Sequence, residues 1–331
     1  MAARPKMLAV KPLLALTVGD PSGIGPEIAP LAAEAVRGEA RVLLLGHAAV
    51  RPESIPLVSA PSDLGDAAAG WIDTGGPDAW RPGEVQASCG AAALSALRAG
   101  HELALAGAVD ALVTGPVNKA AMHAAGERVE GQTELLSRWC GVERYEMLGF
   151  AGKLRVMLST RHVPLREALD RTTTEHVLDR LLFLHEALTA IGIEGPTLAL
   201  AGLNPHAGEG GLFGREELDV LAPAVERARQ AGVDVHGPVA PDSVFLRGLN
   251  GHFDGVLALY HDQAFIPLKL VGAHSGVTYI AGLPYRRFSP MHGTAFDIVG
   301  KRRPDGQPVA DPGNLTEALR VASRITRRTA E

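Results

Sequence analysis

The stretch Leu13–Glu27, LLALTVGDPSGIGPE, indicates the fold class of this chain. Its first six residues have the composition of a buried strand, and Pro26 stands where the first turn of a helix tolerates proline. The glycines between them let the backbone approach a ligand, and the start of a helix favours an anion. The spacing lacks the G-x-G-x-x-G dinucleotide fingerprint, so a tight strand-to-helix turn explains the loop equally well.

Strand-like and helix-like segments alternate along the rest of the chain. We expect further strands at 41–45, 110–114, 154–158, 197–201 and 256–259, and helices at 26–37, 84–106, from 172 onward, 216–231 and 314–328. Thr172 and Glu175 have the capping-box spacing at the start of the third helix. Residues 52–83 are rich in loop-forming residues, with room for one short strand. This alternation predicts an α/β protein with mostly parallel strands and helices on both faces.

Length and composition limit the class of protein. At 331 residues the chain is long for a single core, so two lobes or one large doubly wound unit are expected. A hydrophobic content of 46% with 21% charged residues is typical of a globular protein. The net charge of −5 argues against nucleic acid as a partner, and no apolar run is long enough to span a membrane. The few cysteines, Cys89 and Cys140, fit a reducing cytoplasm, which is the localisation that we expect.

Three histidines follow apolar runs of strand type. His162 comes after 154–158, His206 lies in NPHAGEGG after 197–201, and His261 lies in YHDQ after 256–259. Ligands bind at the carboxyl ends of strands in open α/β sheets, so the three segments should converge on one site. Histidine is a common zinc ligand, and three protein ligands with an open position form the catalytic arrangement. The alternative is that each is an ordinary hydrogen-bonded loop histidine.

Other segments carry candidate binding residues, each with a structural alternative. Thr133, in the segment GQTE, would cap a helix or hydrogen-bond a substrate. Lys269 and Arg287 suit a phosphate group on a substrate, although basic residues are often only solvated. The segment 292–301, HGTAFDIVGK, would wrap an adenosine or simply turn the chain. From the histidines alone, a metal-dependent hydrolase is a further alternative, but it leaves this last segment without a role.

The strings GDPSGIGPE, VTGPVNK, GLNPHAGEGG, YHDQ and HGTAFDI occur in the order in which one enzyme family has them. With them the chain resembles the 4-hydroxythreonine-4-phosphate dehydrogenases of vitamin B6 (pyridoxine) synthesis, over residues 14–300. The resemblance implies two α/β/α lobes with mostly parallel sheets and an interlobe cleft, as in isocitrate and isopropylmalate dehydrogenases. It implies a cofactor-side lobe of 1–130 plus 272–331, which contains both termini, and a central lobe of 131–271 for metal binding and dimerisation.

The resemblance also implies which residues form the site. The expected metal ligands are His162, His206 and His261, with His261 supplied by the neighbouring subunit of a homodimer with shared active sites. The expected substrate contacts are Gln132, Thr133, Lys269, Thr278 and Arg287. The expected NAD contacts are Gly293, Thr294, Ala295 and Asp297. Asp242, Asp262 and Lys269 are the catalytic candidates, with a ligand-orienting and a proton-transfer role both open for the two aspartates.

The implied reaction is the NAD-dependent oxidation of the C3 hydroxyl of 4-phosphohydroxy-L-threonine, followed by β-decarboxylation to 3-amino-2-oxopropyl phosphate. NADP is the alternative cofactor, and zinc is the first choice of divalent metal, with cobalt or magnesium as alternatives. The chain departs from the family pattern on the substrate side, at Gln132, Thr278, Arg286, Phe288 and Met291. The same chemistry on 4-phosphothreonate, 4-phosphoerythronate or a related dihydrodiol acid is therefore the alternative. A binding protein without turnover is a rival of another class.

Overall fold

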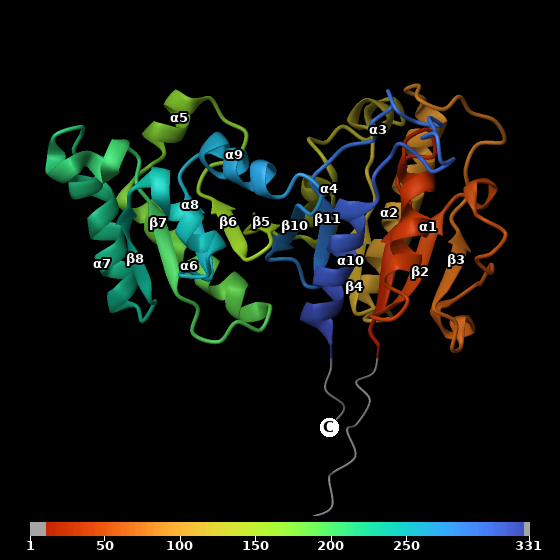
Figure 1. Ribbon diagram of the computed structural model, residues 1–331, viewed down its shortest axis with the longest axis horizontal. Helices are drawn as coiled ribbons and strands as arrows, with labels where there is room; N and C mark the ends of the chain where they lie inside the picture. Colours follow the sequence, from red (N-terminus) through yellow and green to blue (C-terminus); the bar gives the residue numbers. More distant parts are fainter. Residues whose placement is uncertain (1–10, 328–331) are drawn as a thin grey trace, which may run out of the picture. The chain divides into compact units, whose positions relative to one another are not determined.

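The computed structural model describes residues 11–327, which divide into two compact units (Figure 1). One unit runs to Tyr145 and resumes at Leu283, and the other comprises Glu146–Gly282. The second unit is thus inserted into the chain of the first. The assignment of cofactor binding and metal binding to separate lobes stays a prediction. None of the helices described between residues 11 and 327 is long and apolar enough to cross a lipid bilayer.

The first unit is built on a parallel sheet with the strand order β3-β2-β1-β4-β11. The strands are β1 (Leu13–Thr17), β2 (Arg41–Gly46), β3 (Ala69–Asp73), β4 (Ala111–Thr114) and β11 (Arg287–Pro290). Leu14, Leu43 and Leu112 are fully buried, because helices cover both faces of this sheet. The predicted strands of this unit, including the short one within 52–83, are confirmed.

The helices of the first unit are α1 (Gly25–Ala35), α2 (Ala87–Leu105), α3 (Lys119–Ala124), α4 (Gln132–Cys140) and α10 (Gly313–Thr326). Helix α2 packs on β1 and β2 through residues such as Ala96 and Leu97, and α1 packs against α10. Pro26 lies in the first turn of α1, as the sequence predicts. Residues 19–24 therefore form a short loop at the carboxyl end of β1.

The second unit contains a mixed sheet with the strand order β10-β5-β6-β9-β7-β8. The strands are β5 (Glu146–Ala151), β6 (Leu154–Leu158), β7 (Leu198–Ala201), β8 (Val235–Val239), β9 (Gly255–Ala258) and β10 (Val277–Ala281). β5 is antiparallel to β6 and β10, and a tight turn with Gly152 at φ 60° joins β5 to β6. The pairs β6–β9, β9–β7 and β7–β8 are parallel, so most of the strands run parallel, as predicted.

The helices of the second unit include α5 (Leu165–Asp170), α6 (Thr174–Ala190), α7 (Ala222–Gln230), α8 (Pro241–Leu249) and α9 (His261–Val271). Thr173, and not the predicted Thr172, caps α6: its hydroxyl accepts a hydrogen bond from the N–H of His176 at 3.2 Å. The Thr172 hydroxyl instead donates to the carbonyl of Ala168 at 2.8 Å, which closes the preceding helix. A π-helical turn, Glu217–Leu221, precedes α7.

Candidate active site

Two of the predicted metal ligands meet at one edge of the second unit's sheet. β6 and β9 are parallel neighbours, so the segments that follow them, with His162 and His261, leave from the same edge. The ring centroids of these histidines are 5.2 Å apart. A cavity of about 260 Å³ lies beside them, lined by Arg161, His162, Val163, Leu165, Tyr260, His261 and Asp262. One chain therefore brings two of the three histidines together.

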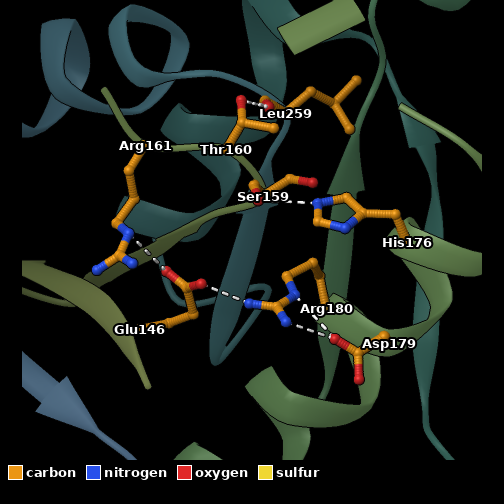
Figure 2. Close-up of polar contacts among 8 residues, drawn as sticks. All are labelled: Glu146, Ser159, Thr160, Arg161, His176, Asp179, Arg180 and Leu259. Carbon is orange, nitrogen blue, oxygen red and sulfur yellow. Dashed lines mark hydrogen bonds and ion pairs between the residues drawn. The ribbon is translucent and has the colours of Figure 1, made fainter. Parts of the chain in front are cut away.

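Hydrogen bonds fix the chain just before these histidines (Figure 2). The buried hydroxyl of Thr160 donates to the carbonyl of Leu259 at 2.8 Å, which joins the ends of β6 and β9. His176 Nε2, on α6, lies 3.0 Å from the carbonyl oxygen of Ser159. These contacts leave the backbone before His162 little freedom to move relative to His261.

Arg161, at the edge of the cavity, contacts a buried carboxylate (Figure 2). Glu146 is 7% exposed, and its Oε2 lies 3.7 Å from Arg161 Nε. Arg180 binds the other oxygen of Glu146 and also Asp179. Glu146 therefore orients the guanidinium groups of Arg161 and Arg180. Its removal would leave these partly buried positive charges without the carboxylate. The sequence alone did not point to Glu146. This residue begins β5, a strand in which buried and exposed positions do not alternate.

His261 is oriented on two sides. Asp262 Oδ1 lies 2.7 Å from His261 Nδ1. This hydrogen bond favours the tautomer in which Nδ1 carries the proton, so that Nε2 offers its lone pair to a metal. The imidazole stacks on Phe265, with 4.6 Å between the ring centroids. Lys269 Nζ lies 5.9 Å from the centroid of the same Phe265 ring, so this predicted phosphate contact belongs to the His261 side of the site.

His206 lies in a left-handed turn after β7. Residues 206–210 have consecutive φ angles between 45° and 79°, although His206, Ala207 and Glu209 are not glycine. This conformation is unfavourable for L-residues and is concentrated at functional sites. The exposed imidazole of His206 has Nδ1 at 3.8 Å from Oδ2 of Asp242, on α8. The two aspartates among the catalytic candidates thus lie near Nδ1 of a predicted metal ligand, Asp262 at 2.7 Å from His261 and Asp242 at 3.8 Å from His206.

Glu217 holds the base of this turn. Its carboxylate is 3% exposed, and Oε1 accepts the backbone N–H groups of Leu203 at 2.8 Å and Asn204 at 2.7 Å. Oε2 accepts a hydrogen bond from Asn204 Nδ2 at 2.9 Å. Burial opposes the charge, but the hydrogen bonds from Asn204 and Leu203 outweigh it and hold the pKa of Glu217 below its usual value. Sequence reasoning missed Glu217; the available signal was a glutamate on the same helical face as the buried Leu221 and Ala224.

Gln263 joins the ends of β9 and β7. Its Oε1 accepts the backbone N–H of Leu259 at 2.7 Å, and its Nε2 donates to the carbonyl of Gly202 at 2.7 Å. The sequence motif YHDQ pointed to its histidine, whereas its last residue is the one that connects the two strands. Gln263 therefore links the backbone of the His261 segment to the backbone that leads into the His206 turn.

The full ligand set is not assembled within one chain. Among residues 11–327, no three His, Cys, Asp or Glu side chains lie close enough together to hold a metal ion. The pair of His162 and His261 nevertheless suits a divalent metal in its donor chemistry, because two imidazoles lie 5.2 Å apart beside a cavity and Asp262 orients one of them.

In the first unit, Arg287 and Gln132 gather around the end of β4. Arg287 is 3% exposed, and its Nη2 donates to Thr114 Oγ1 at 2.6 Å. Burial lowers the pKa of Arg287 to about 10, against the opposing effects of Tyr285 and Glu134, so the guanidinium stays charged at neutral pH. Gln132 Nε2 donates to the carbonyl of Gly115 at 3.1 Å. A buried guanidinium at the end of a parallel strand is suited to a phosphate or carboxylate.

The helix-cap interpretation of Thr133 is wrong. Helix α4 begins at Gln132 with Gly131 as its N-cap, so Thr133 lies inside the first turn and is 8% exposed. Its role as a substrate contact stays a prediction. Thr278 lies in β10, opposite Gly149 of β5, and is 5% exposed.

The predicted cofactor loop packs on the loop that follows β1. The carbonyl of Thr294 accepts a hydrogen bond from the N–H of Ile24 at 3.0 Å. Glu27 Oε1 accepts the N–H of Gly300 at 2.7 Å. A Cβ atom on Gly23 would lie 3.0 Å from the Cβ of Thr294, so glycine permits this close approach.

The loop after β1 is itself a closed turn. Both the N–H and the hydroxyl of Ser22 donate to Asp20 Oδ1, at 2.9 and 2.7 Å. Asp20 is fully buried, and burial raises its pKa above the ordinary value. Ala295, in the predicted cofactor loop, has φ 45°, while Gly293 and Asp297 are exposed. The loop after β1 and the predicted cofactor loop thus both turn tightly, and Gly293 and Asp297 of the cofactor loop are accessible to a ligand.

The chain resembles known proteins in its sequence and in its fold. A family model described as "Pyridoxal phosphate biosynthetic protein PdxA" matches residues 34–322. The D-threonate 4-phosphate dehydrogenase of Pectobacterium atrosepticum is 39% identical over 315 residues, covering 90% of this chain and 97% of that protein. The 4-hydroxythreonine-4-phosphate dehydrogenase of Desulforapulum autotrophicum is 38% identical over 329 residues and covers 95% of each chain.

Solved structures that resemble this chain are also named as dehydrogenases. A 4-hydroxythreonine-4-phosphate dehydrogenase from Klebsiella pneumoniae superposes with a TM-score of 0.83 at 38% identity, covering 97% of this chain and 99% of that one. A terephthalate 1,2-cis-dihydrodiol dehydrogenase from Burkholderia xenovorans has a TM-score of 0.65 at 33% identity, with coverage of 97% and 100%. The predicted α/β fold is confirmed, and these relatives are named as dehydrogenases. The chain belongs to the PdxA family of pyridoxal phosphate biosynthetic proteins.

Proposed function

We propose that this protein is a metal-dependent, NAD-linked dehydrogenase of a four-carbon, 4-phosphorylated 3-hydroxy acid. The observation that carries the proposal is that His162, His261 and His206 follow three neighbouring parallel strands, β6, β9 and β7, in a chain of this family. The first candidate substrate is 4-phosphohydroxy-L-threonine, in cytoplasmic pyridoxine synthesis. D-threonate 4-phosphate is the second candidate. A D-threonate 4-phosphate dehydrogenase is 39% identical to this chain and a 4-hydroxythreonine-4-phosphate dehydrogenase is 38% identical, so identity does not separate the two substrates.

The reaction has two steps. NAD, or NADP as the alternative, would accept the hydride from C3 while the hydroxyl proton is released to solvent, which would give a 3-oxo acid. The C1 carboxylate would then leave as CO2, with the electron pair of the breaking bond taken up by the C3 carbonyl, and a proton from solvent would add at C2 to give the ketone product. A divalent ion, with zinc first and cobalt or magnesium as alternatives, would supply Lewis-acid polarisation of the C3 oxygen.

His162, His206 and His261 are the residues that would hold this ion. Asp262 is hydrogen-bonded to Nδ1 of His261, which supports an orienting role and leaves Nε2 of that ring available. Asp242 Oδ2 lies 3.8 Å from Nδ1 of His206, beyond hydrogen-bond distance, so the orienting role that we propose for Asp242 is supported by proximity only. A ligating imidazole must be unprotonated, so protons compete with the metal and acidification should weaken its binding.

Two basic residues, Arg287 and Lys269, are the proposed phosphate contacts. Arg287 is the stronger candidate, because its guanidinium is buried and already oriented by Thr114. Lys269 is assigned to the same group, and the stacking of Phe265 between it and His261 supports this. Gln132, Thr133 and Thr278 are the proposed neutral contacts, and Gln132 is held by the carbonyl of Gly115. Binding of the phosphate away from C3 would orient the reacting carbon.

The loop with Gly293, Thr294, Ala295 and Asp297 is the proposed NAD contact. Its backbone is fixed to the β1 loop by the hydrogen bond from Ile24. Exposed Gly293 and Asp297 offer a backbone surface and a carboxylate to an adenosine.

We further assign a homodimer with shared active sites. Among the described residues of one chain, His206 does not complete a three-ligand set with His162 and His261, and the resemblance to the family assigns the His261 of each site to a second copy. Helix α9, which begins with His261, also exposes Ile266 at 67% and Leu270 at 81%. Apolar side chains of this size are suited to burial against a second copy of the same helix.

The test is NADH formation from 4-phosphohydroxy-L-threonine, D-threonate 4-phosphate and D-erythronate 4-phosphate, with Zn²⁺, Co²⁺ or Mg²⁺. One of these substrates should give metal-dependent NADH and CO2 in equal amounts. His206→Ala should abolish turnover and leave the oligomeric state unchanged, and Lys153→Ala, on the turn between β5 and β6, serves as the surface control. NADH formation that persists in His206→Ala would count against the ligand assignment, and NADH without CO2 would count against decarboxylation.

A further inference from the structure

The left-handed turn that carries His206 depends on a side chain that is distant in sequence. His206, Ala207 and Glu209 adopt φ angles of 52°, 54° and 45°, which L-residues rarely adopt in succession. A turn of this kind persists only when the surrounding structure holds it. The segment before it begins at Leu203 and Asn204, and both of their backbone N–H groups donate to Glu217.

We propose that Glu217 is a positioning residue for His206: it fixes the backbone that presents the imidazole without touching the metal or the substrate itself. The inference rests on the proposed function, because it requires His206 to be a metal ligand. Its carboxylate is 3% exposed and accepts three hydrogen bonds at 2.7 to 2.9 Å, all from the two residues that enter the turn. A buried acceptor that satisfies successive backbone donors sets where the next residues lie.

A glycine within the turn supports this assignment. A Cβ atom on Gly208 would lie 2.7 Å from Glu217 Oε2, so the carboxylate packs directly against the turn as well as against its entry. Gly210 has a similar φ of 64°, but a Cβ atom there would meet no heavy atom within 4 Å. Both glycines therefore have a positive φ, but only Gly208 lies against Glu217.

The neighbouring glutamate provides a matched control. Glu216 Oε2 accepts a hydrogen bond from the same Asn204 Nδ2, at 2.8 Å, but the Glu216 side chain is exposed. The backbone N–H groups of Leu203 and Asn204 donate to Glu217. Glu217→Gln would place an amide NH2 against the Asn204 amide and remove the charge, whereas Glu216→Gln changes a solvated group.

The experiment is titration of the full-length protein with Zn²⁺ alone by calorimetry, and with Co²⁺ alone by visible absorption. The proteins are wild type, His206→Ala, Glu217→Gln and Glu216→Gln, all measured at a temperature at which circular dichroism shows them folded. We expect Glu217→Gln to bind about tenfold more weakly or worse and to change the Co²⁺ spectrum, as loss of a supporting group does at metal sites. Glu216→Gln should bind like wild type.

The outcomes distinguish a failure of the positioning role of Glu217 from a failure of the assignment of His206 as a metal ligand. If His206→Ala loses binding but Glu217→Gln keeps wild-type affinity and spectrum, the positioning role is overturned and the metal assignment stands. If His206→Ala itself binds like wild type, the metal assignment falls and the positioning role falls with it. If Glu217→Gln does not fold, Gly208→Ala is compared with Gly210→Ala: weaker binding in the first alone supports the inference, and equal binding overturns it.

Discussion

The imidazole rings of His162 and His261 lie 5.2 Å apart at the ends of two paired strands, β6 and β9. Two residues before each histidine, the hydroxyl of Thr160 donates to the carbonyl of Leu259. This side-chain hydrogen bond continues the strand pairing beyond the last ladder position, at Leu158 and Ala258. The separation of the two imidazoles is therefore set by the sheet itself, which is more rigid than a pair of free loops.

Replacement of Thr160 by Val should displace the segments that carry His162 and His261. The change leaves the buried carbonyl of Leu259 without this donor, which costs about 1 to 3 kcal/mol. We expect a lower melting temperature and weaker Zn²⁺ binding in calorimetry. Thr160→Ser keeps the hydroxyl and is the control, so weak binding in the serine variant as well would show that the methyl group, and not the hydrogen bond, matters.

Glu217 should make stability depend on pH in a defined direction. Hydrogen bonds from Asn204 and Leu203 lower its pKa in the folded protein below the ordinary 4.5. Its stabilising contribution is therefore fully present above pH 4.5 and is lost as the pH falls through the lowered value. We expect wild type to melt above Glu217→Gln at pH 7, by a difference that narrows below pH 4.5. A difference that instead widens on acidification would contradict the pKa direction.

The regular elements could be predicted from the sequence because they follow from local patterns. β6 begins and ends where its apolar run does, at Leu154 and Leu158, and Pro26 marks the start of α1. The same local reasoning placed the α6 cap at Thr172 instead of Thr173, since neighbouring threonines offer the same hydroxyl. Which of them caps the helix depends on the tertiary packing of the preceding turn.

The sequence motifs name the candidate site residues, but they do not reveal the side chains that hold these residues in place. The motifs NPHAGEGG and YHDQ pointed to His206 and His261, and strand order then explains why such segments lie at one edge. The full left-handed turn could not be predicted from its sequence, because alanine and glutamate, at positions 207 and 209, do not favour positive φ. Its stability comes from Glu217, which is separated from Asn204 by 13 positions and recognisable only once the fold is known.

Arg287 should contribute more than Arg286 to binding of the substrate's phosphate group. Its guanidinium is buried and charged, with a pKa of about 10, so a bound phosphate would relieve the cost of its desolvation. Arg287→Lys should raise the KM for the phosphorylated substrate by about 10- to 100-fold, equivalent to the loss of about 1.5 to 3 kcal/mol from a charged hydrogen bond. Arg286→Lys is the control, since the contact of Arg286 with Leu112 uses its backbone carbonyl. Equal KM values in the two variants would argue against Arg287 as the phosphate contact.

The packing of Gly23 on Thr294 links the loop after β1 to the proposed NAD site. A Cβ atom at position 23 would lie 3.0 Å from Thr294 Cβ and 3.1 Å from its Cγ2, which is closer than side chains normally approach. Gly23→Ala should therefore displace the loop of Thr294 and Ala295 by a few tenths of an ångström, at a cost of about 1 kcal/mol. We expect a roughly fivefold higher KM for NAD and an unchanged affinity for Zn²⁺. Gly38→Ala, where a Cβ atom would meet nothing within 4 Å, should change neither quantity. If Gly23→Ala instead weakens Zn²⁺ binding and leaves the KM for NAD as it is, the loop would have to be reassigned from the cofactor to the metal side of the reaction.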